Sequence, residues 1–219
     1  MIRFENVDKS FKKKIIFRNL NQAFEEKGVF CILGPSGCGK TTFLNLAAGL
    51  LLPDKGRIIK SSDKISYVFQ EPRLLPWKNI RDNLVYASGN HLSRKEKTEK
   101  AEWLMSLLEI SEAAFKKPVQ VSGGMAKRAS LGRALLAEHD ILFMDEPFSS
   151  LDPDLKERII SRIIPWLKNS LVLLVTHDYL TAQMLSDKVL YFTQPPVEIR
   201  EINRNEIKNA VNLINNKIQ

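Results

Sequence analysis

Apolar residues are distributed along the chain in two distinct patterns. Residues 2–7 (IRFENV) and 15–24 (IIFRNLNQAF) largely alternate between apolar and polar positions, which is typical of strands with one buried face and predicts antiparallel strands near the N-terminus. Three later runs, 29–33 (VFCIL), 141–145 (ILFMD) and 171–175 (LVLLV), are apolar almost throughout. Short continuous runs of this kind predict buried strands.

The segments between these strands have helical character. Residues 41–50 follow the first buried strand, the composition is helical from about residue 77 to residue 138, and residues 153–167 begin with a proline, which suits the first turn of a helix. Within the central segment, Ser93 and Glu96 have the spacing of a capping box, which predicts that a helix begins there.

Weaker patterns predict three more elements. Residues 57–60 and 65–69 are short strands, and Pro53 with Gly56 forms the turn that precedes the first of them. Near the C-terminus, the spacing of four apolar residues predicts a helix over approximately 203–218 that packs on the core. These residues are Ile207, Val211, Ile214 and Ile218.

The order of these elements predicts the fold class. Strands that alternate with helices indicate an α/β protein with a doubly wound, mostly parallel sheet. The alternating strands form an antiparallel β subdomain at the N-terminus, and residues of approximately 77–138 form a helical subdomain inserted in the core. At 219 residues, the chain is long enough to bury a core, and we expect one domain over residues 1–219.

Composition and charge limit the function classes. No apolar run approaches the roughly 20 residues that span a bilayer, and the charged, alternating N-terminus is unlike a signal peptide. The net charge is +8, but the basic residues are dispersed and mixed with glutamates, so we expect no nucleic-acid partner. The two cysteines have no metal-ligand spacing. A cytoplasmic protein follows from these features.

The strongest chemical signal is a phosphate loop that follows the first buried strand. Residues 34–41 (GPSGCGKT) fit the pattern G-x-x-x-x-G-K-[ST]. The glycines let backbone N–H groups surround phosphate oxygens, Lys40 neutralises the β- and γ-phosphates, and the Thr41 hydroxyl is a ligand for Mg²⁺. The predicted nucleotide-binding residues are therefore Gly34, Pro35, Ser36, Gly37, Cys38, Gly39, Lys40, Thr41 and Thr42.

Polar residues follow the other predicted strands at their carboxyl ends, where open α/β sheets bind their ligands. Asp145 is placed to hold Mg²⁺ through water, and Glu146 to polarise the attacking water. His177 follows the third buried strand and can contact the γ-phosphate and the same water. Gln70 can reach the Mg²⁺ or the water and report the state of the nucleotide.

A second sequence suited to anions occurs at residues 122–124 (SGG), directly before an amphipathic run. A hydroxyl and two glycines at a helix start bind anions well, although an ordinary helix cap has the same composition. Two such starts in one small chain indicate either two ligands or two halves of a shared site. The apolar turn at residues 74–77 (LLPW) is likewise either core or a partner surface.

In combination, the motifs GPSGCGKT, Gln70, VSGGM, ILFMDE, SSLD and His177 resemble the nucleotide-binding subunit of an ABC transporter over essentially the whole chain. The resemblance implies that Ser122, Gly123 and Gly124 of one subunit complete the ATP site of a second, identical or homologous subunit, and that Asp152 links the two sites. It also implies that Phe11 stacks on adenine. Val121, Ala126 and Lys127 depart from the usual residues of the family.

The resemblance implies an ATPase that hydrolyses MgATP and drives an integral-membrane permease, bound to the inner face of the membrane and served indirectly by a solute-binding protein. The segment FQEPRLLPW is similar to importers of the nitrate, sulfonate and taurine type, including carriers of pyrimidine precursors. An ABC exporter or lipid-extracting subunit remains an alternative. Three other classes of protein are less consistent with the sequence. A DNA-repair or chromosome ATPase of this family would carry a long coiled coil, and a translation factor would carry two ATP-binding domains in one chain. A nucleotide kinase or GTPase would have no use for the SGG element.

Overall fold

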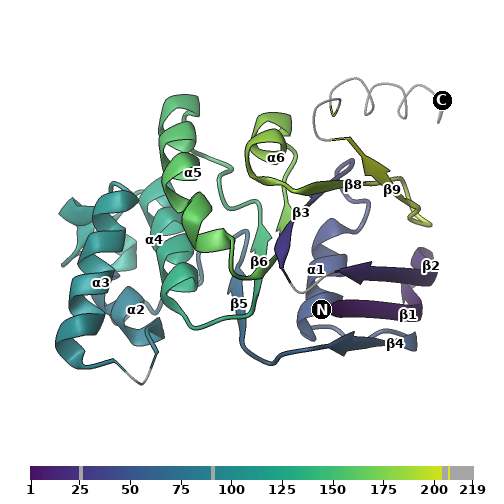
Figure 1. Ribbon diagram of the computed structural model, residues 1–219, viewed down its shortest axis with the longest axis horizontal. Coiled ribbons are helices and arrows are strands. Elements are labelled where there is room, and N and C mark those ends of the chain that lie inside the picture. The colour runs from purple at the N-terminus through teal and green to yellow at the C-terminus, as the bar shows by residue number, and fades with distance from the viewer. Residues whose placement is uncertain (25–26, 90–91, 204–206, 208–219) are drawn as a thin grey trace. The chain divides into compact units, whose positions relative to one another are not determined.

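A computed structural model describes the chain except residues 25–26, 90–91, 204–206 and 208–219 (Figure 1). It divides into two units: Met1–Asp63 with Leu167–Gln219, and Lys64–Trp166. The predicted C-terminal helix over approximately 203–218 lies almost entirely outside the described residues, although Ile207 is described and is buried.

The first unit begins with the predicted antiparallel strands. Strand β1 (Ile2–Phe11) lies between β2 (Lys14–Phe24) and β4 (Lys55–Lys60) and is antiparallel to both. Apolar side chains on one face of β1 are buried, as the alternation predicts. The predicted turn at Pro53 and Gly56 is wrong in its extent, because β4 already includes Gly56. This glycine has a φ of +78°, and a Cβ there would lie 2.3 Å from the backbone oxygen of Asn6.

The parallel strands of the first unit are β3 (Gly28–Leu33), β7 (Leu171–Val175) and β8 (Lys188–Phe192). Strand β3 pairs in parallel with both of the others, while β9 (Ile199–Ile202) is antiparallel to β8. Helices α1 (Lys40–Ala48) and α6 (Tyr179–Leu185) belong to the same unit.

One phenylalanine of α1 organises the core of the first unit. The ring of Phe43 is fully buried and stacks on Phe4 of β1, with the ring centroids 4.5 Å apart. It also meets Phe17, Phe24 and Phe192 edge to face, at 5.1–6.0 Å. These contacts connect α1 to strands of both sheets, so the helix that follows the phosphate loop has a fixed position in its unit.

The second unit combines two parallel strands with four helices. Strand β5 (Ile65–Val68) pairs with β6 (Ile141–Asp145). The helices are α2 (Ile80–Ala87), α3 (Arg94–Leu107), α4 (Gly123–Leu136) and α5 (Pro153–Leu167), with 3₁₀ turns at Ser111–Ala113 and Pro118–Gln120.

Two features that were singled out in the sequence, the capping box and the LLPW turn, lie in the second unit. Helix α3 has the predicted capping box, in which the Ser93 hydroxyl accepts from the Glu96 N–H and the Glu96 carboxylate accepts from the Ser93 N–H. The close packing of α4 depends on Gly132, where a Cβ would lie 2.8 Å from Leu108 Cδ1. Trp77 of the LLPW turn is 70% exposed, which excludes core packing for that side chain.

Candidate functional site

The phosphate loop connects β3 to α1 and depends on its glycines. Gly34, Gly37 and Gly39 have φ values of +152°, +72° and +114°, which side chains rarely tolerate. A Cβ at Gly34 would lie 2.6 Å from the backbone oxygen of Phe192, and one at Gly39 would lie 2.5 Å from Ile16 Cγ2. The loop therefore keeps this conformation only with glycine at these positions.

Two lysines contribute positive charge to the loop. The Nζ of Lys40 donates to the backbone oxygens of Gly34 and Pro35, at 2.7 and 2.9 Å. The Nζ of Lys14, at the start of β2, donates to the oxygen of Gly37 at 3.4 Å. Lys14 could not be selected from the sequence, because it belongs to a basic run that resembles an ordinary solvated surface.

The helix that follows the loop begins without a side-chain cap. Its N-cap is Gly39, which has no side chain to accept a hydrogen bond, and the first turn contains no acidic residue. The first-turn N–H groups and the positive end of the helix dipole therefore suit an anion. Thr41 is exposed in the same turn and Thr42 is half-buried.

The loop also encloses a cysteine whose reactivity can be predicted. Cys38 is fully buried, and burial raises the pKa of its thiol even though the Lys40 ammonium opposes the shift. Only the thiolate attacks alkylating reagents, so we expect N-ethylmaleimide to react slowly with Cys38 at pH 7.5. The reaction should become faster as the pH rises through and above about 8.5, the ordinary pKa of a cysteine thiol.

Peptide mass spectrometry, which separates Cys38 from the equally buried Cys31, measures this rate. The same chain in guanidinium chloride is the control, and we expect it to react at least about tenfold faster at pH 7.5. A rate for Cys38 in the folded chain equal to that in the unfolded chain would contradict the burial argument.

The remaining predicted residues of the first unit are His177 and Phe11. His177 is exposed and follows β7, and the N–H of Thr176 donates to the oxygen of Ile32 in β3 at 3.3 Å. Because β3 and β7 are parallel, His177 and the phosphate loop follow the carboxyl ends of adjacent strands. Phe11 is 47% exposed at the end of β1, with the Lys9 Nζ 5.6 Å from its ring centroid.

In the second unit, three predicted residues lie at or just beyond the carboxyl ends of two paired strands: Gln70, Asp145 and Glu146. Strands β5 and β6 are parallel, with Val68 opposite Met144, so Gln70 lies at the edge of the sheet where Asp145 ends β6. Asp145 is buried. Glu146 is half-buried and has a φ of +51°, a strained conformation for a residue with a side chain. Strain of this kind concentrates at functional sites.

The turn after Glu146 is held by α4. The Ser149 hydroxyl donates to the backbone oxygen of Glu146 at 3.0 Å, and the Nζ of Lys127 in α4 donates to that hydroxyl at 2.7 Å. Lys127 is one of the residues that depart from the resembled family. Here it fixes the turn that positions Glu146, a role that the sequence did not indicate.

The SGG element forms the start of α4. Ser122 is the N-cap, and its hydroxyl accepts a hydrogen bond from the Met125 N–H at 3.2 Å. This contact uses a lone pair, so the hydroxyl hydrogen can still be donated to a ligand. Ser122 and Gly123 are exposed, and Gly124 is half-buried.

Asp152 occupies a similar position at the start of α5. It is exposed, and its Oδ1 accepts from the Leu155 N–H at 2.9 Å. The residues predicted to act on a second subunit are therefore at or near two helix starts of one unit. Each of them except Gly124 is exposed.

The candidate metal ligands carry the donor atoms that a divalent cation prefers. The candidates Thr41, Gln70 and Asp145 offer oxygen ligands, which suit Mg²⁺. Across the described residues, no group of three or more histidine, cysteine, aspartate or glutamate side chains could hold a metal ion. The hydroxyl, amide and carboxylate oxygens of Thr41, Gln70 and Asp145 fit an ion that keeps water and substrate phosphates among its ligands.

Comparisons with known proteins give matches over most of the chain. A family model described as ABC transporter matches residues 17–149. The chain is 34% identical over 211 residues to a nitrate import ATP-binding protein of Synechococcus elongatus, covering 89% of this chain and 77% of that protein. It is 34% identical over 193 residues to an aliphatic sulfonates import ATP-binding protein of Pseudomonas syringae pv. tomato, covering 86% and 80%.

Solved structures agree as well. The dimeric structure of the ATP-binding cassette MJ0796 in a post-hydrolysis state, bound to ADP and Pi, superposes with a TM-score of 0.80 at 26% identity, covering 91% of this chain and 98% of that one. The predicted α/β fold class is confirmed by this likeness.

Among the helices that the structure describes, none is long and apolar enough to cross a membrane.

Proposed function

Because this chain belongs to the ABC transporter family, we propose that it is the ATP-binding subunit of an importer and hydrolyses MgATP to drive a separate membrane permease. The observation that carries the proposal is the presence of two helix starts suited to anions, at Gly39 and at Ser122, one in each unit of the chain. Two subunits arranged head to tail bring each SGG element to the phosphate loop of the other.

The first part of the mechanism is nucleotide binding. Phe11 stacks on adenine, and Lys40 contacts the β- and γ-phosphates. The backbone N–H groups of residues 34–42 other than Pro35 surround the phosphates. Thr41, Gln70 and Asp145 would hold Mg²⁺, which when bound would neutralise charge on the phosphates.

The second part is hydrolysis. Glu146 orients a water and accepts its proton as the water oxygen bonds to the γ-phosphorus. The bond between that phosphorus and the β–γ bridging oxygen breaks, which releases ADP and phosphate. His177 hydrogen-bonds the γ-phosphate and the water. Ser122, Gly123 and Gly124 of the partner subunit donate to the γ-phosphate, and Asp152 of the partner subunit connects the two sites.

Residues of approximately 77–138 act as a helical subdomain, which includes α2, α3 and α4. The subunit is cytoplasmic and is held at the inner face of the membrane by the permease, and a solute-binding protein delivers the solute. Relatives that import nitrate and aliphatic sulfonates support a small solute of that type or a pyrimidine precursor.

Phosphate release as a function of protein concentration tests the central claim. Because each site needs residues of both subunits, we expect specific ATPase activity to rise with protein concentration and then level off. Activity that is independent of concentration while the chain is monomeric would contradict the shared site. Uptake of radiolabelled nitrate or an alkanesulfonate by vesicles that contain the permease distinguishes an importer from the alternative, an exporter or lipid-extracting subunit.

Replacing Ser122 with alanine tests the role of the partner subunit. We expect MgATP affinity of the isolated chain to change by less than about twofold, because Ser122 contacts no nucleotide of its own subunit. Turnover should fall about 100-fold, the usual effect of removing a donor to developing negative charge. Equilibrium binding of a fluorescent ATP analogue and steady-state phosphate release measure the two quantities.

Ser93→Ala is the matched control. Ser93 caps α3 in the same way that Ser122 caps α4, but it belongs to no predicted nucleotide contact. Each substitution removes a cap worth about 1 kcal/mol of stability. Equal losses of turnover in the two variants would mean that capping alone matters and would remove Ser122 from the site.

A further inference from the structure

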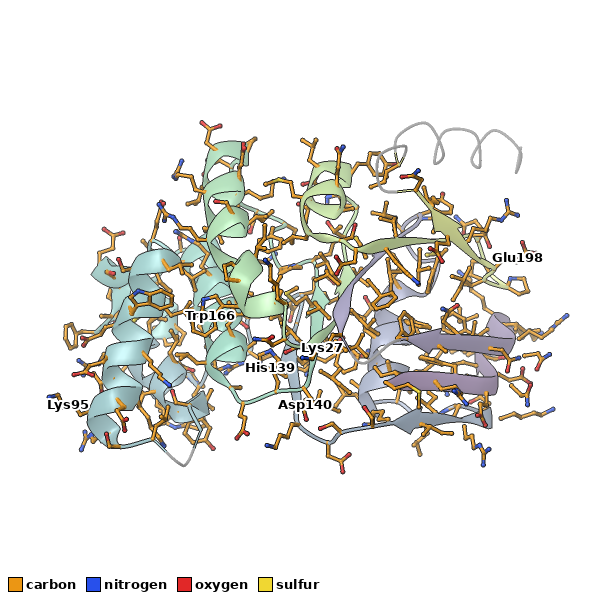
Figure 2. The ribbon with its side chains drawn as sticks, viewed as in Figure 1. Lys27, Lys95, His139, Asp140, Trp166 and Glu198 are labelled. Atoms are coloured by element: carbon orange, nitrogen blue, oxygen red, sulfur yellow. The ribbon has the colours of Figure 1, made fainter. Side chains whose placement is uncertain are left out.

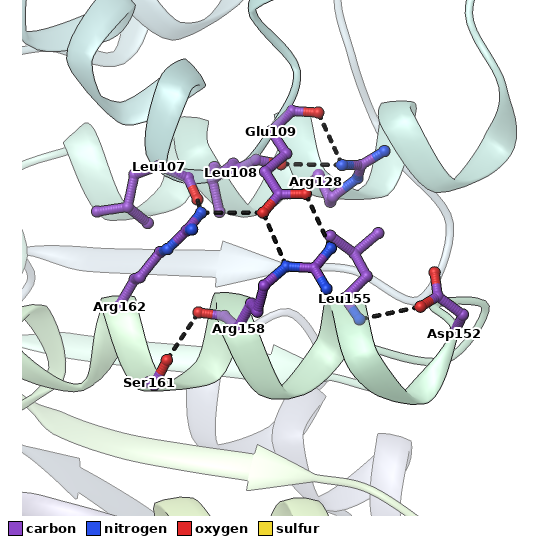
Figure 3. A network of polar contacts seen from close by, with 9 residues as sticks. All are labelled: Leu107, Leu108, Glu109, Arg128, Asp152, Leu155, Arg158, Ser161 and Arg162. Atoms are coloured by element: carbon purple, nitrogen blue, oxygen red, sulfur yellow. Dashed lines mark hydrogen bonds and ion pairs between the residues drawn. The ribbon is translucent and has the colours of Figure 1, made fainter.

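A single glutamate in the second unit connects two helices that carry predicted residues of the shared site. Glu109 follows α3, and its carboxylate pairs with two arginines of α5 (Figure 3). The Nε and Nη2 of Arg158 donate to Oε1 and Oε2, at 3.1 and 3.2 Å. The Nη1 of Arg162 donates to Oε1 at 3.0 Å. The contact with Arg158 is bidentate, which fixes geometry as well as adding energy.

The backbone of the same residue is held from the other side by α4. Arg128 is buried, and its Nη1 donates to the backbone oxygens of Leu108 and Glu109, at 3.0 and 2.8 Å (Figure 3). The Nε of Arg128 also reaches the oxygen of Gly124 at 3.4 Å. Through Arg128, the contacts of Glu109 therefore extend to the SGG element at the start of α4.

Charge and conformation indicate that these contacts are specific. The Arg158 guanidinium lowers the pKa of the Glu109 carboxyl, and burial lowers the pKa of Arg128. Glu109 has a φ of +54° and directly follows Leu108, the C-cap of α3. Its N–H donates to the oxygen of Ser106 at 3.1 Å, and the N–H of Ile110 donates to that of Met105 at 2.9 Å, so the end of α3 fixes this backbone. Three arginines then hold the fixed residue by its backbone and its carboxylate.

We propose that Glu109 is a positioning residue that holds the start of α4 and the start of α5 in one fixed arrangement. This inference rests on the proposed function, in which Ser122 of α4 and Asp152, which caps α5, both serve the ATP site of the partner subunit. With Glu109 in place, the two elements meet that site together. Without its carboxylate, α5 loses its connection to α4 through this network, and the two elements reach the site independently.

Glu109→Gln tests the proposal, because glutamine keeps the size of the side chain and removes its charge. We expect MgATP affinity of the isolated chain to change by less than about twofold, since the phosphate loop is untouched. Turnover at saturating MgATP should fall about tenfold, and the protein concentration that gives half-maximal specific activity should rise about tenfold. A loss of general stability would lower nucleotide affinity as well, so this division is specific to positioning.

Glu99→Gln is the matched control. Glu99 pairs with Lys95 on the surface of α3, at 3.9 Å with both side chains largely exposed, and Lys95 projects away from the ribbon (Figure 2). An exposed pair of this kind contributes little. Turnover and half-maximal concentration in this variant should match those of the unsubstituted chain.

A double-mutant cycle extends the test to the partners of Glu109. Arg158→Met combined with Arg162→Met should reproduce the effects of Glu109→Gln, and adding Glu109→Gln to that pair should cause no further loss, because one network is removed only once. If Glu109→Gln does not fold, as judged by circular dichroism, Arg162→Met alone removes one contact and should shift the half-maximal concentration in the same direction.

The outcomes separate the two proposals. Normal turnover and normal half-maximal concentration in Glu109→Gln, or additive losses in the cycle, would overturn the positioning role while the unsubstituted chain still hydrolyses MgATP cooperatively. An unsubstituted chain with no concentration-dependent hydrolysis would instead overturn the proposed function.

Discussion

Glu146→Gln is expected to bind MgATP with nearly unchanged affinity and to hydrolyse it about 10³-fold more slowly, the usual contribution of a general base. Glutamine retains the shape of the side chain but cannot accept the proton of the attacking water. Because ATP then persists in the shared sites, the variant should accumulate as a dimer. Single-turnover phosphate release and light scattering with and without MgATP measure the two effects.

Glu157→Gln is a suitable control, because Glu157 is exposed on α5 in the same unit. It should hydrolyse MgATP at the rate of the unsubstituted chain and dimerise only transiently. Turnover of Glu146→Gln within a few fold of that rate would show that another group activates the water. The strained backbone at Glu146 would then need a structural explanation.

Lys40→Ala is expected to weaken MgATP binding at least about 30-fold, which corresponds to roughly 2 kcal/mol for the lost hydrogen bonds between a charged group and phosphate. The substitution also removes the two hydrogen bonds from Nζ to the loop carbonyls, so the loop loses internal support before nucleotide arrives. Both effects act in the same direction. Isothermal titration calorimetry with MgATP measures the affinity.

Lys60→Ala separates phosphate binding from support of the helix. The Nζ of Lys60 donates to the backbone oxygen of Ala48, at the opposite end of α1, at 3.2 Å. This contact resembles those of Lys40 but lies far along the helix from the phosphate loop. The affinity of Lys60→Ala for MgATP should stay within about twofold of that of the unsubstituted chain. If Lys40→Ala binds MgATP as tightly as Lys60→Ala does, Lys40 has no role in phosphate recognition.

Continuous patterns in the sequence were sufficient for much of the fold. The buried runs at 29–33, 141–145 and 171–175 each correspond to a strand, and the glycine pattern coincides with a loop between β3 and α1 in which three glycines have positive φ. That this loop binds phosphate stays a prediction. Both signals depend on residues that are close in sequence. Helix α6 and strands β8 and β9, which are seven, five and four residues long, were not predicted. Length alone does not explain this, because strands β5, β6 and β7 are equally short and were predicted.

The supporting contacts of the candidate site could not be predicted from local patterns. Lys14, Lys127 and Glu109 contact groups 23, 22 and 49 residues away in sequence, and no local pattern connects the members of these pairs. A lysine in a basic run and a glutamate after a helix look like surface residues until the fold brings their partners close. The assignment of approximately 77–138 as a separate helical subdomain stays a prediction.

The missing cap of α1 has a thermodynamic consequence. Among the α-helices in the described part of the chain, the other five begin with a side chain that accepts from the first turn: Asn79, Ser93, Ser122, Asp152 and Asp178. Helix α1 begins at Gly39 and has no such group. A phosphate group would serve as its cap, so the nucleotide becomes a component of the folded helix. Amide hydrogen exchange in the first turn of α1 should therefore slow when ATP binds, which makes the local stability of the subunit a measure of the ATP available to it.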